Sequence, residues 1–261
     1  MKIVEPKVFW VGETKIRDQE LEKYLEWVGA PGWVSDATTD SEKIIEVAGR
    51  LCYRSFAPGL NKNVTKIREH NKDYLAHILK VGHGSVLEHA FLNFIFVYVS
   101  RVFTHELVRH RAGTAISQES LRLVRLDDLS FWAPTVIKED QEMMTIFMKS
   151  GEAMEALQKK MAELKKLDDP NMKFDHKKKI TSAMRRLAPD GIATSIFWSA
   201  NPRTIRHCIE MRTDPGAEEE IRLVFGMVGE IMQKNFPNLF ADYTIEMIDG
   251  LPWYKTEHRK V

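Results

Sequence analysis

The most apolar segment of the chain leads directly into its most basic one. Residues 91–99 (FLNFIFVYV) are rich in aromatic and β-branched side chains, which is typical of a strand buried on both faces. Residues 101–125 then carry five arginines against two acids, Glu106 and Glu119, although the net charge of all 261 residues is only +1. Burying an unpaired charge is very costly. We therefore expect the basic segment to lie in water or to meet an anion, while the strand before it anchors it to the core.

Apolar spacing and turn residues predict a mixture of helices and strands. The expected strands are at residues 8–11, 91–99, 118–125 and 192–198. The expected helices are one around Trp27 and others at 41–52, 67–79, 101–112, 139–167, from 174 to near Pro189, 201–212 and from 218 to 231. We see no internal repeat and no low-complexity linker, so the pattern predicts one α+β domain.

Four residues mark the ends of these helices. Ser100 and Asn201 are suited to begin helices, because a side-chain oxygen there accepts a hydrogen bond from a backbone N–H that the helix itself leaves unpaired. Gly82 and Gly113 are suited to end them, because glycine adopts the left-handed conformation of a C-terminal cap without strain. The caps therefore predict where the basic segment and its neighbours change direction.

The basic segment predicts an anion-binding site. Arg109 and Arg111 would lie at the C-terminal end of a helix, and Arg122 would share one face of the strand at 118–125 with Ser120. The arginine fork matches the geometry of phosphate, so the three guanidinium groups could converge on one or two phosphates. A solvated arginine face, paired with the two acids of the segment, remains the alternative.

Two further constellations allow both a ligand and a structural interpretation. Residues 82–84 (GHG) let a ligand approach the backbone closely. The alternative is a helix cap with a histidine whose ring nitrogens are hydrogen-bonded within the protein. Arg203 and His207 are four residues apart and share a helix face, where they meet either a ligand or an acid. No pair of histidines shows the helical spacing of a zinc-protease motif, so we expect no metal site.

Composition excludes several classes of protein. With 44% hydrophobic and 29% charged residues, the chain reads as an ordinary soluble globular protein. Cys52 and Cys208 are too few for a disulfide framework, and neither stands in the glycine-framed turn of a nucleophile. No signal peptide opens the sequence and the longest apolar run is about half a membrane span, so we expect a cytoplasmic protein without a membrane partner. The balanced charge argues against nucleic acid, although an RNA-binding module that uses the basic segment is the alternative from another class.

Nucleotide-binding glycine loops are absent from the sequence. It contains neither GxGxxG nor GxxxxGK[ST], so any bound nucleotide must be held by side chains.

Four ordered segments resemble the flavin-dependent thymidylate synthases. Residues 109–111 (RHR), followed after eight residues by Ser120, resemble the signature of that family. Upstream, residues 82–89 (GHGSVLEH) resemble its GHxTxxEH-like segment. Downstream, residues 201–203 (NPR) and 211–214 (MRTD) resemble its NxR and LRxD segments at similar spacing.

This resemblance implies a fold and an activity. The fold would be a single α+β domain over residues 1–261, with its core at about 40–235 and a central, mostly antiparallel sheet packed with long helices. The protein would be a homotetramer with shared active sites. It would convert dUMP to dTMP with FAD as cofactor, 5,10-methylenetetrahydrofolate as carbon donor and NADPH as reductant, and without a cysteine nucleophile.

The resemblance also implies which residues form the site. Arg212 matches the arginine thought to stabilise the ionised N3 of the uracil, and it is expected to be catalytic together with Ser120. The residues expected to bind the flavin are His83, Ser85, Arg109, His110, Arg111, Gln118, Asn201, Arg203 and His207. Those expected to bind dUMP are Glu106, Arg109, Gln118, Ser120, Leu121, Arg122, Arg185 and Arg212.

A few positions depart from the commonest residues of the family. Glu106 stands where many members have glutamine, which would place a carboxylate near the nucleotide. His207 replaces a frequent asparagine, Gly216 a histidine and Cys52 a frequent serine. The alternative within the same fold is therefore a flavoenzyme that modifies C5 of another pyrimidine nucleotide.

Overall fold

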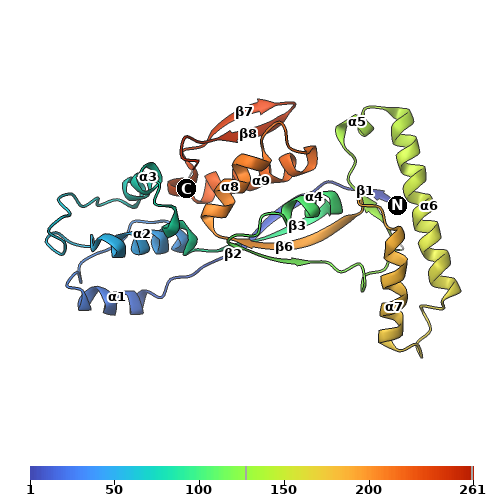
Figure 1. Ribbon diagram of the computed structural model, residues 1–261, viewed down its shortest axis with the longest axis horizontal. Coiled ribbons are helices and arrows are strands. Elements are labelled where there is room, and N and C mark those ends of the chain that lie inside the picture. Colours follow the sequence, from blue (N-terminus) through green and yellow to red (C-terminus); the bar gives the residue numbers. More distant parts are fainter. Residues whose placement is uncertain (127, 260) are drawn as a thin grey trace. The chain divides into compact units, whose positions relative to one another are not determined.

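The computed structural model (Figure 1) describes residues 1–126, 128–259 and 261. The chain divides into two compact units. The first unit comprises residues 1–9, 95–109 and 116–198, and the second comprises 10–94, 110–115 and 199–261. A four-stranded sheet has the order β2 (Lys7–Glu13), β3 (Leu92–Ser100), β6 (Ala193–Ala200), β4 (Thr114–Gln118). Each of these strands contributes residues to both units.

The pair β4·β6 is antiparallel. Asn201 N donates to Gly113 O at 3.1 Å at one end of the pair, and Glu119 N donates to Ser195 O at 3.0 Å at the other. Residue numbers therefore rise along one strand as they fall along the other. The mixed helix-and-sheet fold with an antiparallel sheet is thus confirmed.

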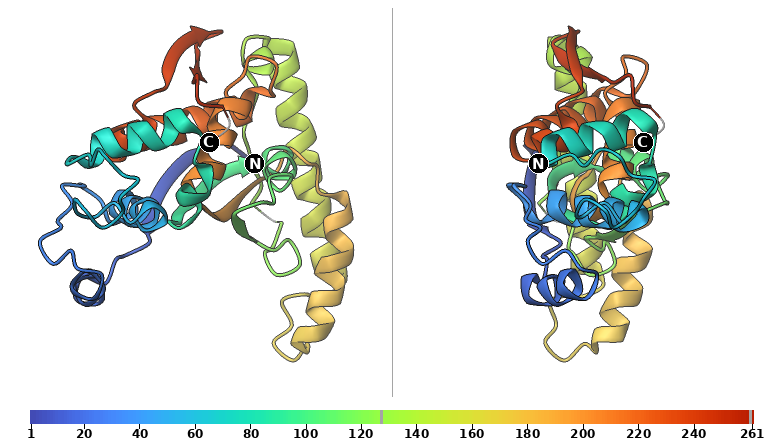
Figure 2. Two further views of the ribbon diagram at one scale, coloured as in Figure 1. Left: turned by 60° about the vertical axis from the view of Figure 1, so that its left-hand side comes forward. Right: turned by 90° about the vertical axis from the view of Figure 1, so that its left-hand side faces the viewer.

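The first unit is mainly helical outside the sheet. Its elements are β1 (Lys2–Ile3), α4 (Arg101–Leu107), β5 (Ser130–Phe131), α5 (Thr135–Lys138), α6 (Gln141–Leu164), α7 (Phe174–Met184) and the 3-10 turn η2 (Arg185–Leu187). α6 and α7 lie side by side (Figure 2), and Gln158 Nε2 of α6 donates to Met184 O of α7 at 3.2 Å. Phe131 and Ile192 are buried in an apolar cluster to which α6 contributes Phe147 and Met154.

The second unit holds the remaining helices and a C-terminal hairpin. Its elements are α1 (Asp18–Trp27), α2 (Asp40–Tyr53), α3 (Asn71–Val81), the 3-10 turn η1 (Gly84–Glu88), α8 (Pro202–Arg212), α9 (Glu219–Asn235), α10 (Pro237–Phe240), β7 (Thr244–Ile248) and β8 (Leu251–Lys255). No helix in the described part of the chain is both long and apolar enough to cross a membrane.

The expected helix caps at Ser100, Asn201 and Gly82 are confirmed. Ser100 Oγ accepts from Phe103 N at 3.0 Å, and Asn201 Oδ1 accepts from Thr204 N at 2.9 Å. Gly82 ends α3 with a φ of 71°, in the left-handed region. These ends were predictable because each depends on one residue and its immediate neighbours.

The strand expected at 118–125 is wrong beyond Gln118, where β4 ends. Leu123 N and Val124 N both donate to Ser120 O at 2.9 Å, and Arg122 N donates to Ser120 Oγ at 3.3 Å. Serine competes for backbone groups in this way and favours a turn over a strand. Ser120 and Arg122 therefore lie in one turn rather than on one face of a strand.

Three further expectations need correction. The helix that Ser100 begins ends at Leu107 rather than at Gly113, so residues 109–111 follow the helix instead of forming its last turn. The strand at 91–99 is not buried on both faces: Leu92, Phe94 and Phe96 are fully buried, whereas Tyr98 is 42% exposed. Ile67, expected on the helical stripe of 67–79, precedes α3, which begins at Asn71.

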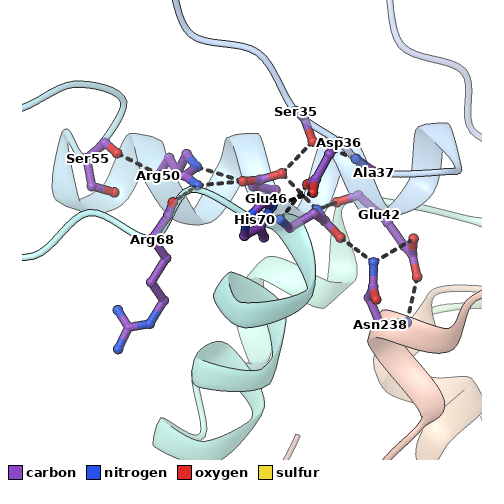
Figure 3. A network of polar contacts seen from close by, with 11 residues as sticks. Ser35, Asp36, Ala37, Glu42, Glu46, Arg50, Ser55, Arg68, His70 and Asn238 are labelled. Atoms are coloured by element: carbon purple, nitrogen blue, oxygen red, sulfur yellow. Dashed lines mark hydrogen bonds and ion pairs between the residues drawn. The ribbon is translucent and has the colours of Figure 1, made fainter.

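A buried polar network joins α2 to α3 and α10 (Figure 3). Glu46 accepts from Arg50 Nε at 2.8 Å and from Asn71 Nδ2 at 2.7 Å. Glu42 accepts from the backbone N of Asn238 at 3.0 Å. Both glutamates are fully buried. Burial raises the pKa of Glu42 to about 7, against the lowering effect of its hydrogen bonds from Asn238 and Thr38.

We expect Glu42 to make the folded chain less stable as the pH rises from about 4.5 to about 7. Its raised pKa means that the folded chain holds this proton more tightly than the unfolded chain, whose glutamate titrates near 4.5. The stabilisation is complete below that value and is lost as the pH passes the folded pKa, by up to about 3 kcal/mol. Urea unfolding of wild type and Glu42→Gln across this range measures the difference, with exposed Glu69→Gln as control. Parallel stability curves for wild type and Glu42→Gln would contradict the prediction.

Candidate functional site

Helix α8 carries three of the predicted site residues of the second unit, and a fourth, Asn201, caps its N-terminus. Asn201 is 3% exposed, and its carbonyl oxygen caps the helix, so only its amide N–H groups remain for a ligand. Arg203 and His207 are both exposed on α8, one turn apart, as their spacing predicted. Arg212 is the last residue of α8 and is half-buried.

The 3-10 turn η1 meets the start of α8. Arg203 Nη1 donates to Glu88 Oε1 at 2.5 Å, and a Cβ added to Gly84 would lie 2.9 Å from Arg203 Nε. A larger residue at position 84 would require this guanidinium group to shift. The structure therefore brings Arg203 to the turn that carries Ser85, which is exposed.

His83, which directly precedes η1, carries an unpaired buried nitrogen. Its Nδ1 is buried and has no hydrogen-bond partner among the residues that the structure describes. Its ring packs edge to face on Tyr53, with ring centroids 5.7 Å apart. A buried nitrogen without a hydrogen-bond partner costs folding free energy. Such a nitrogen is expected where a bound ligand supplies the missing partner. This unpaired nitrogen fits a site that a bound cofactor completes.

Arg212 is held by a buried histidine. Arg212 Nε donates to His110 Nε2 at 2.8 Å, so His110 accepts as a neutral ring with its proton on Nδ1. Burial, the neighbouring Arg212 and His207 together lower the pKa of His110 to about 4. The rings of His110 and His207 meet at a centroid distance of 5.7 Å. The arrangement fixes the direction of a permanent cation at the end of α8.

The loop after His110 is tied to the beginning of α8. Thr204 Oγ1 donates to Ala112 O at 2.8 Å, in addition to the bond from Asn201 N to Gly113 O. Gly113 has a φ of 66° and lies against the side chains of Asn201 and Thr204. These bonds attach the loop of residues 110–113 to the start of α8. Sequence reasoning missed Thr204, for which a single threonine in a helical first turn gives no signal.

The other predicted residues belong to the first unit. Glu106 is half-buried in α4 and Arg109 is exposed just after it, while Gln118 Nε2 donates to Thr104 Oγ1 of the same helix at 3.2 Å. The structure therefore brings the end of β4 to α4. Arg111, by contrast, is exposed and belongs to the second unit, so the boundary between the two units falls within the RHR triplet.

The turn that follows β4 is fixed by α7. Thr181 Oγ1 of α7 donates to Arg122 O at 2.6 Å, and α7 leads directly into η2, which begins at Arg185. Arg122 and Arg185 are both exposed, and Leu121 is half-buried. Two exposed guanidinium groups on connected elements can bind an anion in water, where they need no buried partner.

Cys208 is not placed as a nucleophile. Cys208 is fully buried in α8, and burial raises the pKa of its thiol to about 12. A protonated buried thiol is inert. Cys52 is exposed on α2.

Comparisons with known proteins identify the family. A sequence profile of the family described as "Thymidylate synthase complementing protein" matches residues 34–238. The chain is 35% identical over 227 residues to a flavin-dependent thymidylate synthase of Corynebacterium glutamicum, covering 84% of this chain and 86% of that protein. It is 34% identical over 222 residues to one of Mycobacterium bovis, with the same coverage. The chain therefore belongs to the flavin-dependent thymidylate synthase family, and it is an enzyme.

Two solved structures share the fold. Thymidylate synthase X of Helicobacter pylori, crystallised with FAD and dUMP, matches with a TM-score of 0.55 and 19% identity over 91% of this chain and 98% of that one. The UMP/dUMP methylase PolB of Streptomyces cacaoi, bound to 5-Br UMP, matches with a TM-score of 0.62 and 14% identity over 92% and 95% of the two chains.

Proposed function

We propose that this enzyme converts dUMP to dTMP by FAD-dependent reductive methylation, with 5,10-methylenetetrahydrofolate as carbon donor and NADPH as reductant. The observation that carries the proposal is the 35% identity to a flavin-dependent thymidylate synthase over 84% of the chain. The hydrogen-bonded pair of His110 and Arg212 supports it, because a fixed cation is what a developing uracil anion requires.

FAD would supply hydride transfer, and the chain's own residues would hold it. His83 presents an unpaired nitrogen, and Arg203 is held by η1 and α8. The residues proposed to bind FAD are His83, Ser85, Arg109, His110, Arg111, Gln118, Asn201, Arg203 and His207. These side chains orient the cofactor and set its surroundings, whereas the redox chemistry is its own.

The nucleotide would be held through its phosphate and its ring. Exposed Arg122 and Arg185 are suited to the phosphate, because guanidinium forks match its geometry. Arg212 would stabilise the ionised N3 of the uracil and so make C5 more nucleophilic, with Ser120 also in a catalytic role. The residues proposed to bind dUMP are Glu106, Arg109, Gln118, Ser120, Leu121, Arg122, Arg185 and Arg212.

A cytoplasmic homotetramer with shared active sites completes the proposal. The first unit has an apolar groove of about 430 Å³ between α6 and α7, lined by residues that include Met161, Ile180 and Leu187. Leu164, which also lines the groove, is 71% exposed, and Phe174 of α7 is 66% exposed. Apolar surface of this kind supports burial against another copy of the chain.

The test of the proposed function is an assay with three acceptor nucleotides. We expect the purified protein to bind FAD and turn yellow, to oxidise NADPH only when dUMP is present, and to release tritium from dUMP labelled at C5. UMP and dCMP are compared as acceptors, because Glu106, one of the proposed nucleotide contacts, carries a half-buried carboxylate. A protein that binds no FAD and releases no tritium would refute the proposal, and turnover of UMP or dCMP instead of dUMP would change its substrate.

A further inference from the structure

The C-terminal segment forms one wall of a pocket beside Arg212. The pocket has a volume of about 560 Å³ and lies on the exposed side of the second half of α8. Met211 and Arg212 line it from α8, whereas Trp253 and Arg259 line it from the C-terminal segment. Small-molecule sites typically have volumes of about 300–1,000 Å³. The family profile ends at residue 238, so the matched region accounts for neither Trp253 nor Arg259.

The hairpin β7–β8 that carries Trp253 is a well-formed element. Its strands are antiparallel, and its turn residues Asp249 and Gly250 have φ values of 54° and 75°. A turn with positive φ at both central residues has a backbone twist that matches the twist of the two flanking strands. Sequence reasoning did not predict this element, although Asp-Gly between apolar residues is its strongest short signal.

Close packing fixes the hairpin to α9. A Cβ added to Gly226 would lie 2.8 Å from Pro252, and one added to Gly229 would lie 2.5 Å from the ring of Tyr254. The two glycines therefore let β8 approach α9 closely (Figure 1). Tyr254 is 3% exposed, and alternation along the strand turns Trp253 to the opposite side.

A second set of contacts fixes the segment to α8. Tyr254 N donates to Thr213 Oγ1 at 3.0 Å, immediately after Arg212. Arg259 Nε pairs with Glu210 Oε1 at 2.5 Å. The wall of the pocket is thus held in place before any ligand arrives, which lowers the cost of binding.

The chemistry of the pocket combines an aromatic ring with guanidinium groups. Lys255 Nζ lies 4.5 Å from the centroid of the Trp253 ring, and the same ring borders the pocket. Arg259 has a 69% exposed side chain, and its ion pair with Glu210 is made through Nε. Glu210 neutralises part of the charge of Arg259 by pairing with its Nε. The exposed fork remains suited to a carboxylate or phosphate.

We propose that this pocket binds a planar heteroaromatic ligand that carries an anionic group, with its ring against Trp253 and its anion on Arg259. The inference rests on the proposed function, in which both cosubstrates have this chemistry: a reduced pterin with glutamate carboxylates and a nicotinamide dinucleotide with phosphates. The pocket also contains Arg212, the proposed partner of the uracil. A cosubstrate bound here lies beside the nucleotide that it serves.

The test measures binding to the FAD-loaded enzyme without turnover. The variants are Trp253→Leu and Arg259→Ala, and the controls are Trp27→Leu, at a position 84% exposed on α1, and Arg17→Ala, at an exposed position before α1. NADPH and the stable reduced folate 5-formyltetrahydrofolate are the two probes, titrated separately by calorimetry. The dissociation constants for dUMP and FAD and the melting temperature are measured for every variant.

We expect each pocket variant to bind one of the two probes at least about tenfold more weakly, which is what a lost stacking or charge-assisted contact of about 1.4 kcal/mol gives. The probe that weakens identifies the ligand, while dUMP, FAD and both controls change less than about twofold. The inference is overturned if both probes bind both pocket variants as tightly as wild type, if wild type binds neither, or if dUMP and FAD weaken equally. Because no step requires turnover, a failed dUMP assay refutes the proposed function separately.

Discussion

Replacing Arg212 by alanine is expected to lower kcat for dUMP by about 100-fold while raising the dissociation constant of dUMP much less. Removing one fixed donor that faces a developing anion typically costs about 10²–10³ in rate. Arg212 is half-buried, and His110 fixes its direction through the bond from Nε. The interaction strengthens as the uracil becomes anionic, so its loss falls on turnover rather than on binding.

The neighbouring histidine supplies the control for this prediction. His110→Phe fills the same space without accepting from Arg212, whereas His110→Gln keeps an acceptor. We expect His110→Phe to lower kcat, His110→Gln to restore part of it, and the double variant with Arg212→Ala to lose little more than Arg212→Ala alone. Because the pKa of His110 is about 4, this hydrogen bond persists throughout the neutral pH range. Exposed Arg17→Ala is the matched arginine control, and an unchanged kcat in Arg212→Ala would show that the residue has another role.

Local chemistry made several parts of the fold predictable from sequence. The caps at Ser100 and Asn201 and the glycine end at Gly82 depend on a few adjacent residues, and all three are found where they were expected. The turn at Ser120 was missed because alternation of residue types does not reveal that the serine backbone and hydroxyl both accept from the next residues. The end of α4 at Leu107 was missed because Gly113 was the only helix-end signal that the sequence offered after Ser100.

The sequence indicated candidate residues for the site but not their hydrogen-bond partners. The resemblance singled out His110 and Arg212 as separate contacts, 102 positions apart in the chain, yet nothing in the sequence indicated that they bond to each other. Likewise, Glu88 and Arg203 form an ion pair that only the folded chain reveals. Pairing across long separations depends on tertiary packing, which residue spacing does not encode.

Gly113→Ala is expected to destabilise the second unit by about 3 kcal/mol and to weaken FAD binding by at least about tenfold. Gly113 has a φ of 66°, and an added Cβ would lie 2.2 Å from Asn201 Nδ2 and 2.6 Å from Thr204 Oγ1. The left-handed conformation costs alanine about 1 kcal/mol. Displacing Asn201 from its cap costs about another 1 kcal/mol, and the disturbed loop bonds add a similar amount. The same displacement moves three proposed flavin contacts, namely His110, Arg111 and Asn201.

Gly59→Ala separates backbone strain from lost contacts. Gly59 has a φ of 86°, but a Cβ there would meet nothing within 4 Å. We therefore expect this control to lose only about 1 kcal/mol and to bind FAD normally, because it suffers the strain without the collision. Urea unfolding and FAD titration of both variants give the comparison. Equal losses in the two variants would mean that the loop of residues 110–113 does not depend on its attachment to α8, and that the flavin contacts are positioned by something other than the bonds from Asn201 and Thr204.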